Sequence, residues 1–270
     1  MKRSIVVGLL FSVLLALLVG CGQETSQTAC PLNPRGGLSR SIEPVKTVTI
    51  LEPSRNYFWA PVYLADALGY FEDEGLEVTF QALDGDNEAS DGTLILSDLE
   101  TILTTRDQKV ILSTTQRGSP QCTGAWLQVN AGHLTDLATM KPETARYEGF
   151  VVAVPGDLPE TDPDVVQKAA NAIARAIEWM EEVQPEEIAR ELSRFFPGEE
   201  DALLAAARYD KTHEITSQTG RHTHRGFAAA VEGSASGELP VESAIYAEIF
   251  LNQARDQLNA TRLCRKHGAA

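Results

Sequence analysis

The sequence predicts an α/β domain, and three observations support this expectation. Two short stretches, 46–51 and 76–81, alternate apolar with polar residues and are rich in β-branched side chains, as strands are. The stretch between them has apolar residues at helical spacing. Farther along the chain, an apolar run of strand length is followed by two segments with helical periodicity. Strands that alternate with helices favour a sheet covered by helices.

The N-terminus predicts export before any domain begins. Two basic residues are followed by an uncharged, mostly apolar run of 15 residues, 5–19. A membrane-spanning helix needs about 20 apolar residues, so this run is short for a permanent span and fits the apolar region of an export signal. It closes on small residues before Cys21, the arrangement that bacterial lipoprotein processing requires. We therefore expect residues 1–20 to be a signal peptide and Cys21 to carry acyl chains such as palmitate; an ordinary signal peptide containing a cysteine is the alternative.

The next segment, 21–44, is predicted to be a tether, because it is rich in Gly, Pro, Ser and Thr and has almost no apolar run. Residues 45–265 then form the domain, which is long enough for one large unit or two small lobes. Several acyl chains on one cysteine hold a protein at the bilayer without a spanning helix. The expected location is extracytoplasmic, anchored by lipid to a bacterial membrane at the cell surface or in the periplasm.

The charge balance is strongly acidic. The whole chain has 23 basic and 38 acidic side chains, and loss of the signal peptide leaves 21 against 38, a formal charge of −17. Such a surface repels nucleic acid and anionic lipid headgroups, so neither is an expected partner. An anionic small ligand remains possible, because a local pocket can oppose the global field.

Three cysteines remain after Cys21, namely Cys30, Cys122 and Cys264. An odd number allows at most one disulfide among them and leaves one thiol over. Their spacing matches no metal-binding knuckle.

Three histidines, His213, His222 and His224, include a His-x-His pair that can present two imidazoles on one side of a strand. No third ligand has matching spacing, and residues 210–225 are polar and contain glycine, so we expect a solvated loop. Motifs for nucleophilic catalysis, phosphate binding or paired-carboxylate chemistry are also missing from the sequence. The prediction is therefore no metal, no cofactor and no enzymatic activity.

The first strand, helix and second strand form a βαβ unit. Pro61 lies at the start of the predicted helix 61–68, and the ligand side of such a unit is the loop at the carboxyl end of the first strand. The stretch TVTILEPSRNYFWAPVYLADALGYFEDEGLEVTFQAL resembles the opening of bacterial substrate-binding proteins for sulfonates, nitrate, taurine and thiamine-pyrimidine precursors, which have a thiamine pyrimidine synthase-like domain. The matching positions are Ala60, Pro61, Tyr63, Ala65, Gly69, Tyr70, Phe71, Glu74, Gly75, Leu76 and Val78.

The resemblance continues more weakly along the chain. Residues 92–116 resemble the family's third strand, a helix and the hinge strand, and residues 147–196 resemble its returning strand and two helices, expected at 164–183 and 185–195. A last helix is expected at 241–258. The implied fold class is α/β, type II periplasmic-binding-protein-like.

The chain departs from the family in its middle. Between the second and third strands only nine residues, 84–92, remain, too few for a crossover helix of about ten or more. Where the family inserts its whole second lobe, this chain has about 30 residues, between Gln116 and Tyr147. We expect the first lobe to be retained and the second, at 117–150, to be rudimentary.

The resemblance also implies where a ligand lies, above the carboxyl ends of the strands. The first loop can offer hydrogen-bond donors and aromatic rings, with the alternative that Phe58 and Trp59 are core or interlobe aromatics. Asp84 and Asp86 in the second loop are expected to be solvated. An aspartate in the third loop would repel an anion and favours a cationic or neutral heterocycle. The candidate ligand-binding residues are Ser54, Asn56, Tyr57, Trp59, Ser97 and Asp98.

The function implied is that of a monomeric lipoprotein that captures a small organic or oxyanion solute and delivers it to an ABC permease. Two alternatives stay open. A truncated family member could keep the fold and bind nothing, because the middle is short. A thiamine-pyrimidine biosynthetic enzyme is disfavoured, because that branch is cytosolic and has clustered cysteines.

Overall fold

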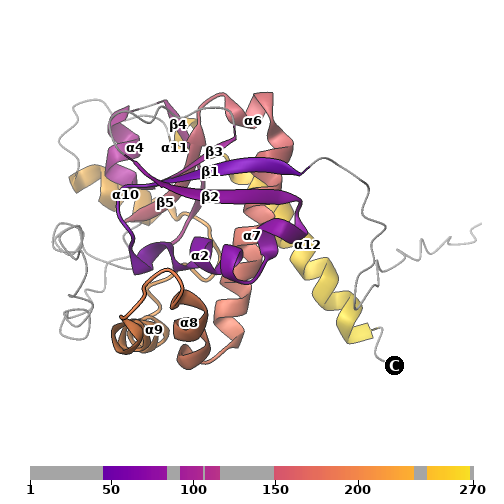
Figure 1. The fold of residues 1–270 in the computed structure, drawn as a ribbon. Coiled ribbons are helices and arrows are strands. Elements are labelled where there is room, and N and C mark those ends of the chain that lie inside the picture. Colours follow the sequence, from indigo (N-terminus) through magenta and orange to yellow (C-terminus); the bar gives the residue numbers. More distant parts are fainter. Residues whose placement is uncertain (1–44, 84–91, 106, 116–148, 234–241, 268–270) are drawn as a thin grey trace, which may run out of the picture.

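The computed structural model describes residues 45–83, 92–105, 107–115, 149–233 and 242–267. In this part of the chain a five-stranded sheet has helices on both faces (Figure 1). The strands are β1 (Lys46–Glu52), β2 (Leu76–Ala82), β3 (Thr93–Asp98), β4 (Gln108–Ser113) and β5 (Phe150–Pro155).

The strand order is β2-β1-β3-β5-β4. The strand β1 pairs parallel with β2 and β3, whereas β5 pairs antiparallel with both of its neighbours, β3 and β4. Four strands therefore run in one direction, and the single reversed strand, β5, comes last in sequence. The predicted α/β class is confirmed.

One face of the sheet carries the larger core. Apolar side chains of the sheet, such as Ile50 and Leu96, pack there against helices from both halves of the sequence. The elements on this face are η1 (Tyr57–Trp59), α2 (Ala60–Ala67), α3 (Tyr70–Asp73), α7 (Pro163–Glu182), α8 (Pro185–Leu192), α9 (Glu200–His213) and α12 (Glu248–His267).

The opposite face carries a smaller core. Ile95, Val110 and Val151 contact apolar residues of α4 (Leu99–Thr105), α10 (His224–Gly233) and α11 (Glu242–Ile245). A short helix, α6 (Leu158–Thr161), leads from β5 into α7. The result is a three-layer arrangement, as expected for a sheet whose strands are apolar on both faces.

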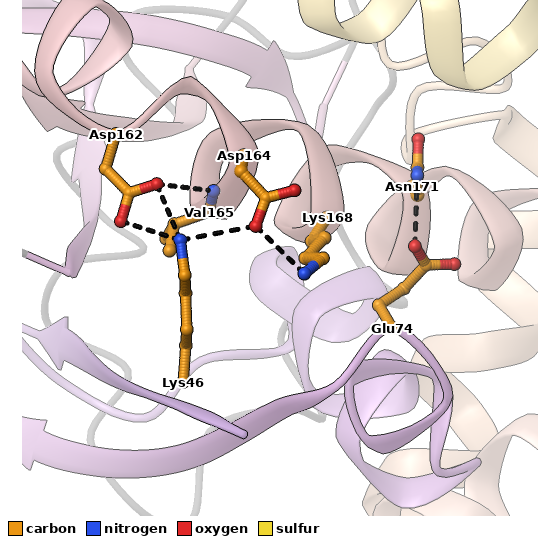
Figure 2. A network of polar contacts seen from close by, with 7 residues as sticks. All are labelled: Lys46, Glu74, Asp162, Asp164, Val165, Lys168 and Asn171. Carbon is orange, nitrogen blue, oxygen red and sulfur yellow. Dashed lines mark hydrogen bonds and ion pairs between the residues drawn. The ribbon is translucent and has the colours of Figure 1, made fainter. Parts of the chain in front are cut away.

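The long helix α7 begins at a capped and charged N-terminus. The Asp162 carboxylate accepts a hydrogen bond from Val165 N at 3.3 Å, and Pro163 occupies the first turn. Lys46 Nζ, at the start of β1, contacts Asp162 at 2.8 Å and Asp164 at 3.2 Å, and Lys168 joins Asp164 at 2.9 Å (Figure 2). This network fixes α7 to the amino edge of the sheet, opposite the loops that follow β1 and β3.

Two of the four helices expected from sequence form within one residue of their predicted ends, and a third ends early. The helix predicted at 61–68 is α2, that at 164–183 is α7, and that at 185–195 corresponds to α8 with a shortened end. Gly69 and Gly75 have φ values of +72° and +77°, which supply the left-handed turns on either side of α3.

The continuous helix predicted at 241–258 is wrong. Two helices, α11 and α12, flank a break at Tyr246 and Ala247. Tyr246 forms a β-bridge with Val110, and Ala247 N donates to the Val110 carbonyl at 2.8 Å. The backbone at the break therefore extends the sheet edge, which competes successfully with helix formation.

Several predictions lie wholly or mostly outside the described residues. These are the signal peptide 1–20, the tether 21–44 with Cys21, and the second lobe at 117–150, of which only Gly149 and Phe150 are described. Cys264 takes part in a disulfide, and the other three cysteines of the chain lie outside the described residues. Among the helices that the structure describes, each is too short or too polar to cross a bilayer.

Candidate functional site

The carboxyl ends of β1, β3 and β4 meet at one edge of the sheet, and β5 begins there. Asp98, the last residue of β3, lies opposite Phe150, the first residue of β5. The chain leaves the described range after Thr115 and re-enters it at this same edge, where Phe150 N donates to Thr115 Oγ1 at 3.0 Å. The predicted second lobe would therefore connect to the body through this edge.

Loop 1, defined as residues 53–59, follows β1 at this edge. Ser54 is half-buried. Asn56 is buried, and its Oδ1 accepts a hydrogen bond from Phe58 N at 3.0 Å, which caps η1. The Asn56 side chain thus fixes the shape of loop 1.

The aromatic rings of loop 1 pack on the first residue of β5. Phe58 stacks on Phe150 with ring centroids 4.5 Å apart, and Trp59 meets Phe150 edge to face at 5.3 Å. Trp59 is only 1% exposed, and its Nε1 has no hydrogen-bond partner within the described structure. A buried donor without a partner is uncommon in native proteins and calls for an explanation.

Tyr57 points its hydroxyl at a buried carboxylate, to which it donates at 3.2 Å. That carboxylate belongs to Asp210 in α9, which is far away in sequence. Burial, together with the neighbouring Asp210, raises the pKa of the Tyr57 hydroxyl well above its ordinary value. The phenol is therefore a fixed neutral donor.

Ser97 and Asp98 close the third strand. Ser97 is buried, and its Oγ donates to the Asp98 carbonyl at 3.2 Å. The Asp98 carboxylate accepts from both Thr101 N and Thr101 Oγ1 at 2.8 Å, which caps α4. Three of the six candidate residues thus lie at Phe150 or at its β3 partner, namely Trp59, Ser97 and Asp98. Asn56 and Tyr57 instead bond to Phe58 N and Asp210. The role of all six as ligand contacts stays a prediction.

Sequence reasoning missed a charged cluster beside loop 1. Glu52, at the end of β1, is 7% exposed and accepts from Tyr63 Oη at 2.6 Å. Arg55 donates to the other carboxylate oxygen through Nε at 3.1 Å and Nη2 at 2.5 Å. Its guanidinium faces the rings of Tyr63, Phe80 and Phe195 at 5.5–6.0 Å from their centroids.

The Glu52–Arg55 spacing of three residues was a local signal that could have revealed this pair. The contact with Phe195 depends on packing of distant segments and left no such signal.

Asp210 was also missed, because it lies in the stretch expected to be a solvated loop. It is 6% exposed and accepts from Thr216 N at 2.7 Å and Thr216 Oγ1 at 2.6 Å. Burial raises the pKa of the Asp210 carboxyl, against the opposing effect of hydrogen bonds from Thr216 and Tyr57. Thr216 forms a β-bridge with Thr115 at the candidate edge.

The prediction of a solvated loop at 210–225 is correct only in part. Residues 214–223 lie outside helices, but the two ends of the stretch belong to α9 and α10, and several of its residues are buried. His213 belongs to α9. The His222 side chain is 12% exposed, stacks on Tyr246 at 3.7 Å, and faces Glu242 at 2.9 Å and Glu248 at 2.7 Å. His224 is 87% exposed and contacts Glu242. No group of three or more His, Cys, Asp or Glu within the described ranges is arranged to hold a metal ion.

Comparison with known proteins supports the resemblance found in the sequence. The family described as NMT1/THI5 like matches residues 56–138, which include most of loop 1 and the elements from α2 to β4. A search among curated proteins finds no match.

Among solved structures, a protein of Bordetella bronchiseptica RB50 has a TM-score of 0.63 and 14% identity, covering 79% of this chain and 98% of that one. A mutant of DSZB in complex with biphenyl-2-sulfinic acid has a TM-score of 0.54 and 12% identity, covering 79% and 99%. The periplasmic nitrate-binding protein NrtA of Synechocystis PCC 6803 is less similar, with a TM-score of 0.47 and 11% identity over 80% and 89%.

At these identities the structural similarity concerns the fold. DSZB is described as a desulfurization enzyme, so a similar fold occurs in an enzyme. The chain is therefore an α/β protein that shares its fold with the Bordetella protein and with DSZB, and it carries an NMT1/THI5-like segment at residues 56–138.

Proposed function

We propose that this protein is the extracytoplasmic, lipid-anchored solute-binding component of an ABC importer. The solute is a small organic molecule or oxyanion of the sulfonate, nitrate, taurine or pyrimidine type, and the protein acts as a monomer that delivers it to a permease. The NMT1/THI5-like match and the periplasmic-binding-protein fold support the solute-binding role.

One observation carries the proposal, namely the indole N–H of Trp59 at the carboxyl edge, which has no partner among the described residues. Its ring packs against Phe150, which lies opposite Asp98, so it belongs to the point where loop 1, β3 and β5 meet. A buried donor without a partner costs about 1–3 kcal/mol. A hydrogen-bond acceptor on the solute would satisfy this donor and offset that cost.

Calorimetry of the purified full chain tests the proposal, with sulfonates, nitrate, taurine and aminopyrimidines as probes. Trp59→Phe keeps an aromatic ring against Phe150 but removes the N–H, which makes it a sharper variant than alanine at a position 1% exposed. We expect the wild type to bind one probe and Trp59→Phe to bind it roughly tenfold more weakly, the loss of about one hydrogen bond.

The matched control is Phe58→Leu, which alters the packing of loop 1 on Phe150 without removing a donor. If Trp59→Phe binds as tightly as the wild type, the indole N–H is not a ligand contact. A folded protein that binds none of the probes would favour the truncated, non-binding family member.

The anchor is tested separately through Cys21. Metabolic labelling with a fatty-acid analogue should mark the wild-type protein and leave Cys21→Ala unlabelled, because its thiol is the proposed site of acylation. Cys30→Ala is the matched control and should keep the label. Label retained on Cys21→Ala would contradict the lipoprotein assignment.

Catalysis is not part of the proposal. The similarity to DSZB concerns the fold alone, at 12% identity. The described side chains at the candidate edge that could act chemically include hydroxyls, an amide, the Arg55 guanidinium and the carboxylates of Glu52, Asp98 and Asp210. Product formation from a bound probe, followed by NMR, would require an enzymatic function instead.

A further inference from the structure

We propose that Asp210 is a positioning residue of the ligand edge, which couples loop 1 to the strand leaving β4. The inference rests on the proposed function, because it concerns how the same edge is held. It predicts that a substitution at Tyr57 speeds amide exchange at Ser217 and Phe150, which lie far from Tyr57 in sequence.

The Asp210 carboxylate is held in one orientation. Oδ1 accepts from Thr216 N, and Oδ2 accepts from both Thr216 Oγ1 and Tyr57 Oη. Asp210 itself lies in the last turn of α9, a rigid part of the larger core. Loop 1 and the segment after α9 therefore both bond to the same carboxylate, that of Asp210.

The segment after α9 is in turn paired with the strand that leaves β4. Thr216 bridges Thr115, Ser217 N donates to the Thr114 carbonyl at 2.8 Å, and Ser113 N donates to the Gly220 carbonyl at 2.8 Å. Residues 113–115 are thus fixed through residues 216–220. They are also the last described residues before the predicted second lobe.

Contacts between the strand that leaves β4 and the start of β5 close a ring that leads back to loop 1. Thr114 N donates to the Phe150 carbonyl at 3.0 Å, and Phe150 N donates to Thr115 Oγ1. The Phe150 ring then contacts Trp59 in loop 1. Two routes of contact therefore lead from residues 113–115 to loop 1, one through Phe150 and one through Thr216 and Asp210.

The neighbouring Glu52 provides the matched comparison. It is also a buried carboxylate at the carboxyl edge that accepts a tyrosine hydroxyl, that of Tyr63. Its other partner is Arg55, so this cluster ties β1 to α2 and loop 1 without including Thr216. Tyr57→Phe and Tyr63→Phe each remove a hydrogen bond to a buried carboxylate, and Tyr63→Phe also removes the acceptor of Asn56 N at 3.4 Å. Only the Tyr57 bond reaches Asp210 and Thr216.

Amide hydrogen exchange of the solute-free full chain tests the coupling. Tyr57→Phe should speed exchange at Ser217 N and Phe150 N about tenfold more than Tyr63→Phe does, the effect of one hydrogen bond to a buried carboxylate. Exchange at amides of the central strand β1 reports the loss of global stability in each variant, and the rates at Ser217 N and Phe150 N are compared after this loss is subtracted. Equal effects of the two variants, or faster exchange confined to loop 1, would overturn the proposal.

Asp210 itself is tested by a pair of substitutions. Asp210→Ala removes every acceptor and should loosen loop 1 and residues 216–217 together. Asp210→Asn should restore most of the protection, because its amide oxygen can accept from Thr216 N while its NH₂ donates to Tyr57 Oη. If Asp210→Ala does not fold, the comparison of Tyr57→Phe with Tyr63→Phe still tests the coupling.

Solute titration separates this inference from the proposed function. If a probe binds, Tyr57→Phe should raise its Kd severalfold more than Tyr63→Phe does. If a probe binds and the two variants exchange equally, the proposed function is supported and the coupling through Asp210 is contradicted. If no probe binds and the expected exchange pattern is seen, the coupling is supported and the proposed function is contradicted.

Discussion

Glu52 and Tyr63 share a hydrogen bond of 2.6 Å that joins the last residue of β1 to the middle of α2. Both side chains are buried, and the Glu52 carboxylate also receives Arg55. Burial, together with the neighbouring Glu52, raises the pKa of the Tyr63 hydroxyl well above its ordinary value, so it remains a donor. The bond therefore fixes where loop 1 begins.

Tyr63→Phe should lower the free energy of unfolding by roughly 1.5–3 kcal/mol, because a buried charged acceptor loses a partner. The measurement is urea denaturation followed by circular dichroism. Tyr70→Phe is the control, because the Tyr70 hydroxyl makes no hydrogen bond within the described chain; its effect should stay within about 0.5 kcal/mol. Equal losses in both variants would contradict a special role for the Glu52 bond.

Because of Asp210, we expect the free energy of unfolding to depend on pH. Its pKa is raised in the folded protein above the ordinary value of 3.8, mainly by burial, so the folded state binds the proton more tightly than the unfolded state. The free energy of unfolding should therefore fall as pH rises from about the ordinary value through the raised one, and level off above it.

Asp210→Asn removes this titration, so its stability relative to the wild type should improve as pH rises through the same window. Denaturant titrations at several pH values measure the difference. A difference between wild type and variant that stays constant with pH would show that the carboxyl does not titrate as proposed.

At the start of α7, the contributions of helix capping and of the ion pair to stability can be measured separately. Asp162 both caps the helix and pairs with Lys46, and the two side chains are 36% and 35% exposed. Asp162→Asn keeps a capping oxygen and loses only a partly exposed ion pair, which contributes at most about 1 kcal/mol and less at high salt.

Asp162→Ala loses the cap as well and should cost about 1 kcal/mol more than Asp162→Asn. Thermal melts at low and high salt measure both variants. The gap between the two variants should persist at high salt, and a gap that vanishes with salt would contradict the capping role.

The parts of the fold that were predictable depend on local signals. The helix α2 and its flanking strands follow from Pro61, two turn glycines and short-range periodicity, and each formed close to its expected bounds. The break between α11 and α12 arises from pairing with Val110, more than a hundred residues away, which no local pattern encodes.

The same limit applies to the candidate site. Loop 1 could be located, because the ends of parallel strands meet at one edge. The partner of Tyr57 could not, because Asp210 is 153 residues away and the stretch around it is polar in composition. Stacking of Phe58 on Phe150 likewise depends on β5 returning between β3 and β4.

Asp98 is the candidate ligand residue whose charge can be tested without disturbing the fold. Its two carboxylate oxygens cap α4 through Thr101, and it lies opposite Phe150. Asp98→Asn keeps one capping acceptor and removes the negative charge, so the unfolding free energy should change by less than about 1 kcal/mol. A negative charge at the site opposes anionic solutes and favours cationic ones.

If Asp98 borders the bound solute, Asp98→Asn should therefore tighten the binding of nitrate and sulfonates severalfold and weaken that of cationic aminopyrimidines. Calorimetry with both classes of probe measures this. Glu100→Gln removes an equal charge from the first turn of the same helix at an exposed position and serves as the control. The control removes a charge from α4 but leaves the end of β3 unchanged. Equal changes in Kd for the two variants would therefore mean that Asp98 acts through long-range electrostatics and does not contact the solute.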